Sequence, residues 1–134
     1  MLGDKNMITL NEFKSASTFQ NIISKLFEAR DFIHKAHLQA KSRSYAEHKA
    51  LANYAKFGDF ADTLYEVYSG QYGLIKFELS KAPEMEPISY FEDLGKFCIA
   101  AHDAIEKRDT HLHQLLDNVT EEVYHVLYKL KFLK

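Results

Sequence analysis

The sequence predicts an all-α protein, in which four helices form a bundle of two antiparallel helical hairpins joined by a long crossover. Apolar residues recur with the helical period of about 3.6 in four segments. Two of the five glycines and both prolines lie in residues 69–87, which predicts one long connection in the middle of the chain. No segment alternates apolar and polar residues for long enough to form a strand.

Each predicted helix carries one apolar stripe. The first stripe comprises Phe19, Ile22, Ile23, Leu26, Ile33 and His37. The second comprises Leu51, Tyr54, Phe57, Ala61, Leu64, Tyr65 and Tyr68. The third comprises Phe91, Leu94, Phe97, Cys98, Ala101 and Ile105, and the fourth comprises Leu112, Leu115, Leu116, Val119, Val123, Val126 and Leu130.

The predicted connections divide the chain into four helical segments. We expect breaks at 41–44 and 107–110, with Ser44 and Asp109 as N-caps of the helices that follow. A crossover at about residues 70–88 joins the hairpins within one domain, residues 1–134.

Composition narrows the functional classes. The chain is 46% hydrophobic and 27% charged with a net charge of −2, so we expect no strong binding to nucleic acid and none to membranes. The N-terminus lacks the features of a signal peptide. The single cysteine, Cys98, lies in an apolar run, which predicts a buried thiol in a cytoplasmic protein.

A metal centre inside the bundle is disfavoured by the positions of the charged residues. Glu122 and His125 form an E-x-x-H pair of the kind found in di-iron bundles. On a helical wheel they lie about 70° and 130° from the apolar centre. Arg30 occupies the centre of the first apolar stripe, and we expect Glu28 on the opposite side.

A second stripe on the second helix fits a metal site better. It comprises His48, Ala52, Ala55, Asp59, Asp62, Glu66 and Ser69. If the first hairpin closes around residue 43, His37 comes close to His48. Asp62 and Glu66 then lie about two helical turns or more away. A second copy, packed antiparallel across a two-fold axis, brings its carboxylates to these histidines, and the small Ala52 and Ala55 permit the approach.

These residues, in the order His37, His48, Asp62, Glu66 and Gly70, resemble the helix-hairpin signature of the Dps proteins, which are ferritin-like proteins of starved bacteria. The rhythm of residues 109–133 is similar to the last helix of that family. The resemblance implies a ferritin-like fold and a homo-oligomer. It also implies ferrous iron held by His37 and His48 of one chain and by Asp62 and Glu66 of another. Ferroxidase and iron-storage activity would follow from such a site.

An alternative remains open, namely a ferritin-like bundle without a working metal site that serves as a structural or protein-interaction module. Dps proteins commonly carry an acidic ligand four residues after the second histidine, where this chain has Ala52. A polar stripe is also typical of a solvated helix face, and His37 of a hydrogen-bonded core histidine. With few lysines near either terminus, we expect no functional DNA binding.

Overall fold

The computed structural model describes residues 10–40 and 45–133, with the side chains of 16–40 and 45–133. The helices are α2 (Leu10–Leu38), α3 (Tyr45–Ala50), α4 (Tyr54–Tyr72), α5 (Pro87–Ala104) and α6 (Thr110–Phe132). No strand occurs within these ranges, so the predicted all-α class is confirmed. None of the described helices combines the length and the apolar character needed to cross a membrane.

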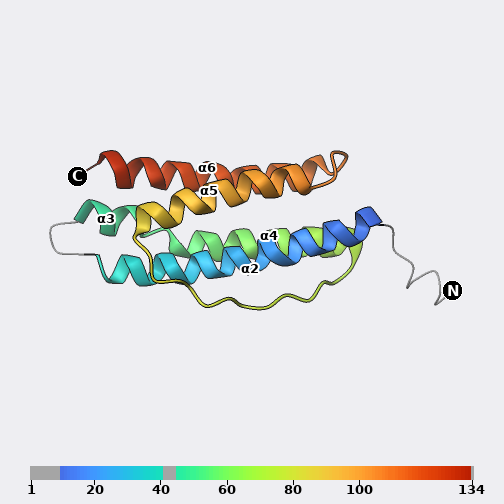
Figure 1. Cartoon of the computed structure of the whole chain (residues 1–134), viewed down its shortest axis with the longest axis horizontal. Helices are drawn as coiled ribbons and strands as arrows, with labels where there is room; N and C mark the ends of the chain where they lie inside the picture. The colour runs from blue at the N-terminus through green and yellow to red at the C-terminus, as the bar shows by residue number, and fades with distance from the viewer. Residues whose placement is uncertain (1–9, 41–44, 134) are drawn as a thin grey trace.

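The helices pair as two layers (Figure 1). α2 packs antiparallel to α4, and α5 packs antiparallel to α6. The connection through residues 73–86 contains no helix and runs back along the length of the bundle, so α4 and α5 point in the same direction. α2 also contacts α5, and α4 contacts α6, which closes the bundle.

The predicted apolar stripes meet in the core. Its largest fully buried side chains are Phe19, Ile22, Ile23, Leu26, Ile33, Leu51, Phe57, Leu64, Phe91, Leu94, Leu112 and Leu116. Every one of these residues belongs to one of the four stripes predicted from the sequence, so the helical period located the interior of each helix correctly.

The crossover is held against α2 and α4 by aromatic packing and two hydrogen bonds. The ring of Phe77 lies 5.7 Å from that of Phe27 in α2 and 5.6 Å from that of Tyr65 in α4. Tyr65 donates to the carbonyl of Ile75 at 3.2 Å, and Ser24 donates to the carbonyl of Glu78 at 2.5 Å. The long segment therefore follows a defined path over the α2–α4 groove.

The prediction of one continuous second helix is wrong, because the chain turns between α3 and α4. Leu51 in this turn is fully buried, and the side chain of Asn53 donates a hydrogen bond to Glu122 of α6. Lys56 adds an ion pair to the same carboxylate at 3.0 Å. These contacts fix the turn to α6. Ser44, the predicted cap, lies outside the described residues.

The predicted positions of Arg30 and Glu28 on α2 are also wrong. Glu28 is 9% exposed and accepts hydrogen bonds from Lys25 at 3.1 Å and from the hydroxyl of Tyr90 at 2.8 Å. Arg30 is half-buried and bonds to the neighbouring Asp31 at 3.1 Å. The reason is that α2 packs against both α4 and α5, so its buried arc is wider than one stripe.

Candidate metal site

The two predicted histidines meet at the corner between α2 and α3. Nδ1 of His37 lies 2.7 Å from the carbonyl oxygen of His48, and Nδ1 of His48 lies 2.8 Å from the carbonyl oxygen of His37. The rings stack with their centroids 3.8 Å apart. The expected closure of the first hairpin thus brings these side chains into direct contact, with each holding the other's backbone.

The reciprocal bonds determine which ring nitrogen carries the proton. A carbonyl oxygen only accepts, so both Nδ1 atoms must donate. In the neutral rings of His37 and His48 the lone pair is therefore on Nε2. Histidines that ligate metals commonly have this arrangement, in which the nitrogen remote from the metal donates to a backbone carbonyl. Each histidine thus has one nitrogen suited to a metal.

The stacking limits how the pair can use those nitrogens. An imidazole binds a metal in the plane of its ring, at about 2.0–2.1 Å for zinc. The planes of His37 and His48 are inclined by only 22° at a separation of 3.8 Å. An ion in the plane of one ring lies well out of the plane of the other. In this conformation the rings do not chelate one ion together, and each offers a single donor.

The predicted carboxylates do not join the histidines within one chain. Asp62 and Glu66 lie on the exposed side of α4, where neither makes an ion pair or a hydrogen bond to a described residue. Asp62 lies eight residues after Tyr54, the first residue of α4, so about 12 Å of helix separates it from the α3–α4 turn. Among the described residues, no three histidine, cysteine or acidic side chains are grouped so that they could hold a metal.

In the E-x-x-H pair of α6, Glu122 makes a structural contact with the α3–α4 turn. Its carboxylate accepts hydrogen bonds from the side chains of Asn53 and Lys56. His125, one turn later, is exposed. Neither side chain belongs to a group of three or more histidine, cysteine or acidic side chains among the described residues that could hold a metal.

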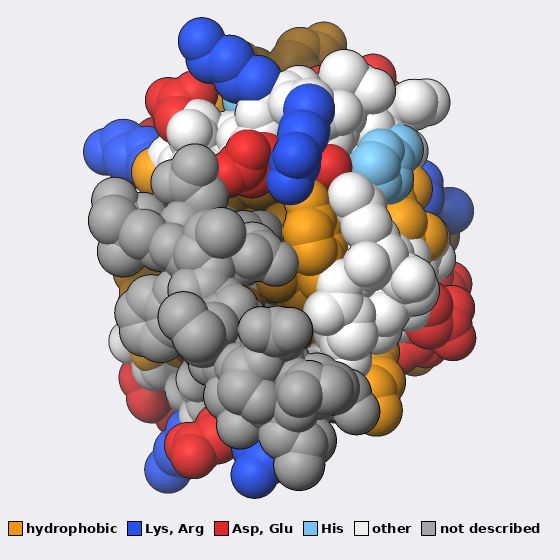
Figure 2. All heavy atoms as spheres, turned by 90° about the vertical axis from the view of Figure 1, so that its right-hand side faces the viewer, with side chains coloured by type: hydrophobic (Ala, Val, Ile, Leu, Met, Phe, Trp, Pro, Cys, Tyr) orange, Lys and Arg blue, Asp and Glu red, His pale blue; other side chains and the backbone are white. Residues whose placement is uncertain are grey.

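A second group of histidines lies where α5 turns into α6. His113 bonds through Nε2 to the carbonyl of Glu106 at 3.0 Å, and its ring meets that of His102 edge-on at 4.3 Å. Nε2 of His102 lies 3.4 Å from a carboxylate oxygen of Asp117. Figure 2 views the molecule from this end, where basic, acidic and histidine side chains lie above a strip of hydrophobic side chains.

Sequence reasoning missed the role of Asp109 at the same end. It occupies the predicted N-cap of α6, but its side chain makes no capping bond. Instead it is 2% exposed and accepts hydrogen bonds from Tyr72 at 2.5 Å and Gln71 at 2.9 Å. Burial alone would raise the pKa of Asp109. The bonds from Tyr72 and Gln71, with the charges of His111 and Arg108, outweigh burial and lower that pKa.

The buried thiol was predicted correctly. Cys98 is 1% exposed and forms no disulfide. Burial raises the pKa of this thiol to about 11, so it stays protonated and unreactive at neutral pH.

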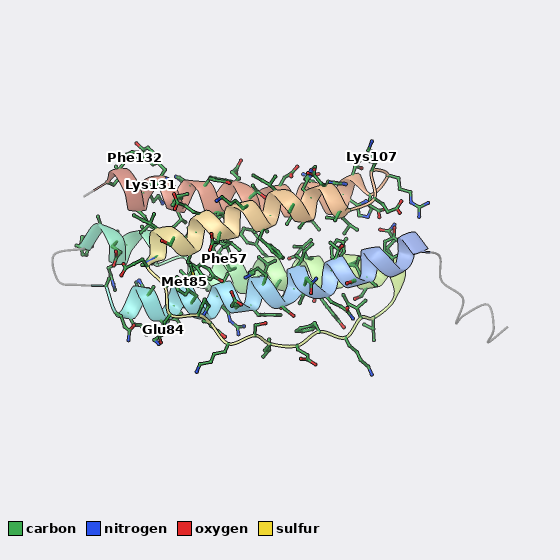
Figure 3. All side chains as sticks on the ribbon, viewed as in Figure 1. Phe57, Glu84, Met85, Lys107, Lys131 and Phe132 are labelled. Carbon is green, nitrogen blue, oxygen red and sulfur yellow. The ribbon has the colours of Figure 1, made fainter. Side chains whose placement is uncertain are left out.

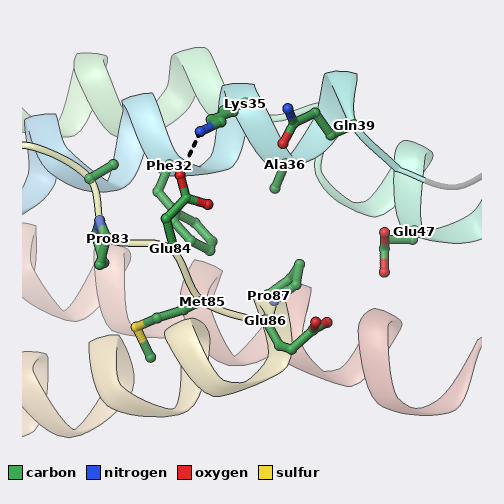
Figure 4. Close-up of a pocket in the computed structure, with 11 residues that line it drawn as sticks. Phe32, Lys35, Ala36, Gln39, Glu47, Pro83, Glu84, Met85, Glu86 and Pro87 are labelled. Carbon is green, nitrogen blue, oxygen red and sulfur yellow. Dashed lines mark hydrogen bonds and ion pairs between the residues drawn. The ribbon is translucent and has the colours of Figure 1, made fainter.

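A small cavity of about 230 Å³ lies between α2, α3 and the end of the crossover (Figure 4). Phe32, Met85 and Pro87 form apolar parts of its wall. Lys35 and Glu84 form a 3.0 Å ion pair at its edge. The volume is below the range of about 300–1,000 Å³ typical of small-molecule sites. It contains none of the four candidate metal ligands.

A comparison with protein families gives a match over most of the chain. Residues 37–130, more than half of the chain, match DUF5856, a family of unknown function. The chain belongs to DUF5856. The matched range includes all four candidate ligands of this DUF5856 protein, from His37 to Glu66. No curated protein and no solved structure matches the chain.

Proposed function

We propose that this DUF5856 protein is a ferritin-like, Dps-like homo-oligomer that binds ferrous iron between two of its chains in the cytoplasm. The observation that carries the proposal is the reciprocal Nδ1 bonding of His37 and His48, which leaves both Nε2 lone pairs for a metal. The parallel course of α4 and α5, joined by a crossover along the bundle, supports the ferritin-like part.

The proposed ligands are His37 and His48 of one chain with Asp62 and Glu66 of the other. Imidazole nitrogen and carboxylate oxygen are ordinary donors for ferrous iron. The exposure of both carboxylates on α4, with no competing partner among the described residues, fits a role in binding across an interface. Because the stacked rings cannot ligate one ion together, each bound ion takes one histidine nitrogen, and the carboxylates complete its coordination shell.

The iron is the substrate in this proposal. Bound ferrous ions would each lose one electron to peroxide or oxygen, a weak ferroxidase activity, and a closed assembly would retain the ferric product. The part played by this chain is to hold the iron. The backbone hydrogen bonds of His37 and His48 fix the orientation of their rings, and the carboxylates balance the charge of the metal.

The alternative function, a structural or interaction module without a metal, is favoured by one specific observation. The bonds between His37 and His48 already close the α2–α3 corner, so the pair has a structural role that requires no ion. This alternative predicts that removing either histidine loosens the corner and leaves metal affinity unchanged.

Anaerobic calorimetry with Fe(II) tests the proposal. We expect saturable binding to the wild type and none to the double variant His48→Ala/Asp62→Ala. The matched control His125→Ala/Asp93→Ala removes an exposed histidine and an exposed carboxylate elsewhere and should bind as the wild type does. Asp62→Asn alone should weaken binding without affecting the fold, since Asp62 is exposed. Equal binding by the wild type and by the His48→Ala/Asp62→Ala variant would overturn the proposal, as would its absence from the wild type.

A further inference from the structure

The outer face of α6 carries a stripe of exposed aromatic residues. Tyr124, Tyr128 and Phe132 follow one another at intervals of four residues and are 40%, 53% and 67% exposed. Ile99 of α5 is 51% exposed. Figure 3 labels Phe132 at the C-terminal end of α6, on the layer opposite the crossover. Tyrosine and phenylalanine are enriched in protein interfaces, and a continuous exposed stripe of them marks a contact surface.

The same helix changes the sign of its charge from one end to the other. Asp117 and Glu121 are exposed in its first half, and Lys129 and Lys131 lie in its last turns. Asp117 precedes Tyr124 by seven residues and Lys131 follows it by seven. Seven residues are close to two helical turns, so Asp117, the aromatic stripe and Lys131 share one side of α6.

An open apolar groove continues this face at the basic end. It has a volume of about 620 Å³ and lies between α3 and the end of α6. Tyr45, Ala50, Phe132 and Leu133 line it together with Lys49 and Lys129. The groove therefore combines apolar side chains with two positive charges, which suits an acidic helix that also presents apolar side chains.

We infer that this face binds a second copy of the chain, with the two α6 helices antiparallel across a two-fold axis near Tyr124. In that arrangement Asp117 of each chain lies opposite Lys131 of the other, and the acidic half of each helix faces the end of the other chain's α6, where the groove containing Lys49 and Lys129 lies. A surface that complements itself in this way suits the isologous contact of a two-fold dimer. A parallel pair would place like charges together.

Gly95 of α5 supports the close approach of a second helix. A Cβ atom at this position would lie 2.6 Å from the hydroxyl oxygen of Tyr124. The absence of a side chain lets the Tyr124 ring lie low against α5. The centre of the face is consequently flatter than it would be over a larger residue.

Charge reversal tests the inference by sedimentation velocity on the full chain. Asp117→Lys and Lys131→Asp should each weaken self-association by at least about tenfold, because each places two pairs of like charges across the axis. The double variant Asp117→Lys/Lys131→Asp should restore it. Lys76→Asp, a reversal at an exposed position in the crossover, is the matched control and should have no effect.

Two controls distinguish a loss of this association from a loss of folding and from an effect at the proposed metal interface. Lys131 pairs with Glu92 at 3.0 Å within the chain, so thermal unfolding followed by circular dichroism checks that each variant is folded. Asp62→Asn/Glu66→Gln lies on α4 and should leave this association intact. The inference is overturned if the wild type shows no association that the single reversals weaken, or if the double reversal fails to restore it.

Discussion

Two buried carboxylates each accept a hydrogen bond from a tyrosine hydroxyl on a different helix. Glu28 of α2 is bonded to Tyr90 of α5, and Asp109 at the start of α6 is bonded to Tyr72 of α4. Burial and the Glu28 carboxylate raise the pKa of Tyr90 well above its ordinary value of 10, so its hydroxyl keeps the proton that it donates. These two bonds connect the α2–α4 hairpin with the α5–α6 hairpin, one near the start of α5 and the other at the start of α6.

Removing one hydroxyl measures the strength of such a bond. Tyr90→Phe leaves the buried Glu28 with Lys25 as its remaining partner, so we expect a loss of about 1–3 kcal/mol in the free energy of unfolding. Urea unfolding provides the measurement. Tyr128→Phe removes an exposed hydroxyl as the control and should change stability little; equal effects of the two substitutions would contradict this account.

The pKa of Asp109 determines how stability changes in acid. Because folding lowers this pKa below its ordinary value of 3.8, the ionised carboxylate stabilises the fold above that pH. The contribution is lost as the pH falls from 3.8 through the lower pKa of the folded state. We expect Asp109→Asn to be less stable than the wild type near neutrality, with the difference shrinking in acid. Urea unfolding from about pH 6 to pH 2.5 checks this, and a constant difference would refute it.

At the scale of single residues, the sequence predicted partners close in the chain better than distant ones. The spacing of His37 and His48 around one turn was enough to predict their meeting. The stacking and the exchange of backbone bonds depend on the angle between α2 and α3, which no spacing specifies. Asp109 was recognised by its position before a helix, but its partner Tyr72 lies 37 residues earlier and no local pattern connects them.

At the scale of helices, the apolar period located all four segments because it reports which side of each helix is buried. It did not reveal the break between α3 and α4, since the contact that fixes this turn joins Asn53 to Glu122, 69 residues later. It also assigned α2 a single stripe, although two neighbouring helices bury a wider arc that includes Glu28.

Two helical glycines offer a matched comparison. Gly95→Ala brings a methyl group against the ring of Tyr124, so we expect a loss of about 1–3 kcal/mol in unfolding free energy. Gly70→Ala, in the last turn of α4, meets nothing within 4 Å and should stabilise by about 0.4–1 kcal/mol. Thermal unfolding of both variants measures the contrast. If Gly95→Ala is as stable as Gly70→Ala, α5 and α6 do not approach each other as closely as described.

The crossover can be tested in the same way. Phe77→Ala removes the ring that packs on both Phe27 and Tyr65, and should release the segment from the α2–α4 groove. Faster proteolytic cleavage within residues 73–86 reports this release. Leu79→Ala, at a position 66% exposed, is the control and should be cleaved at the wild-type rate. Equal cleavage rates in the two variants would mean that Phe77 does not hold the crossover.

At the scale of the whole molecule, the two proposed contacts use different helices of one chain. The metal site joins the α2–α3 corner of one copy to the exposed side of α4 in another, and the aromatic face joins α6 to α6. Two different two-fold contacts on one chain generate an assembly larger than a dimer. Under both proposals, each chain supplies part of a site that association would complete. The polar stripe of the second helix suggested the metal contact from the sequence, whereas the α6 contact depends on which side of that helix the fold leaves exposed.

Mixing two defective chains tests the central claim, a metal site shared between subunits, most directly. One variant carries His37→Ala/His48→Ala and the other carries Asp62→Ala/Glu66→Ala, so neither alone should bind Fe(II) anaerobically. After unfolding and refolding together, half of randomly formed pairs are mixed and each mixed pair has one intact site, which restores about one quarter of the wild-type binding capacity. Recovery of that fraction is the predicted result. If the mixture binds no more Fe(II) than its separate components do, while the wild type binds it, the site is not shared between two chains.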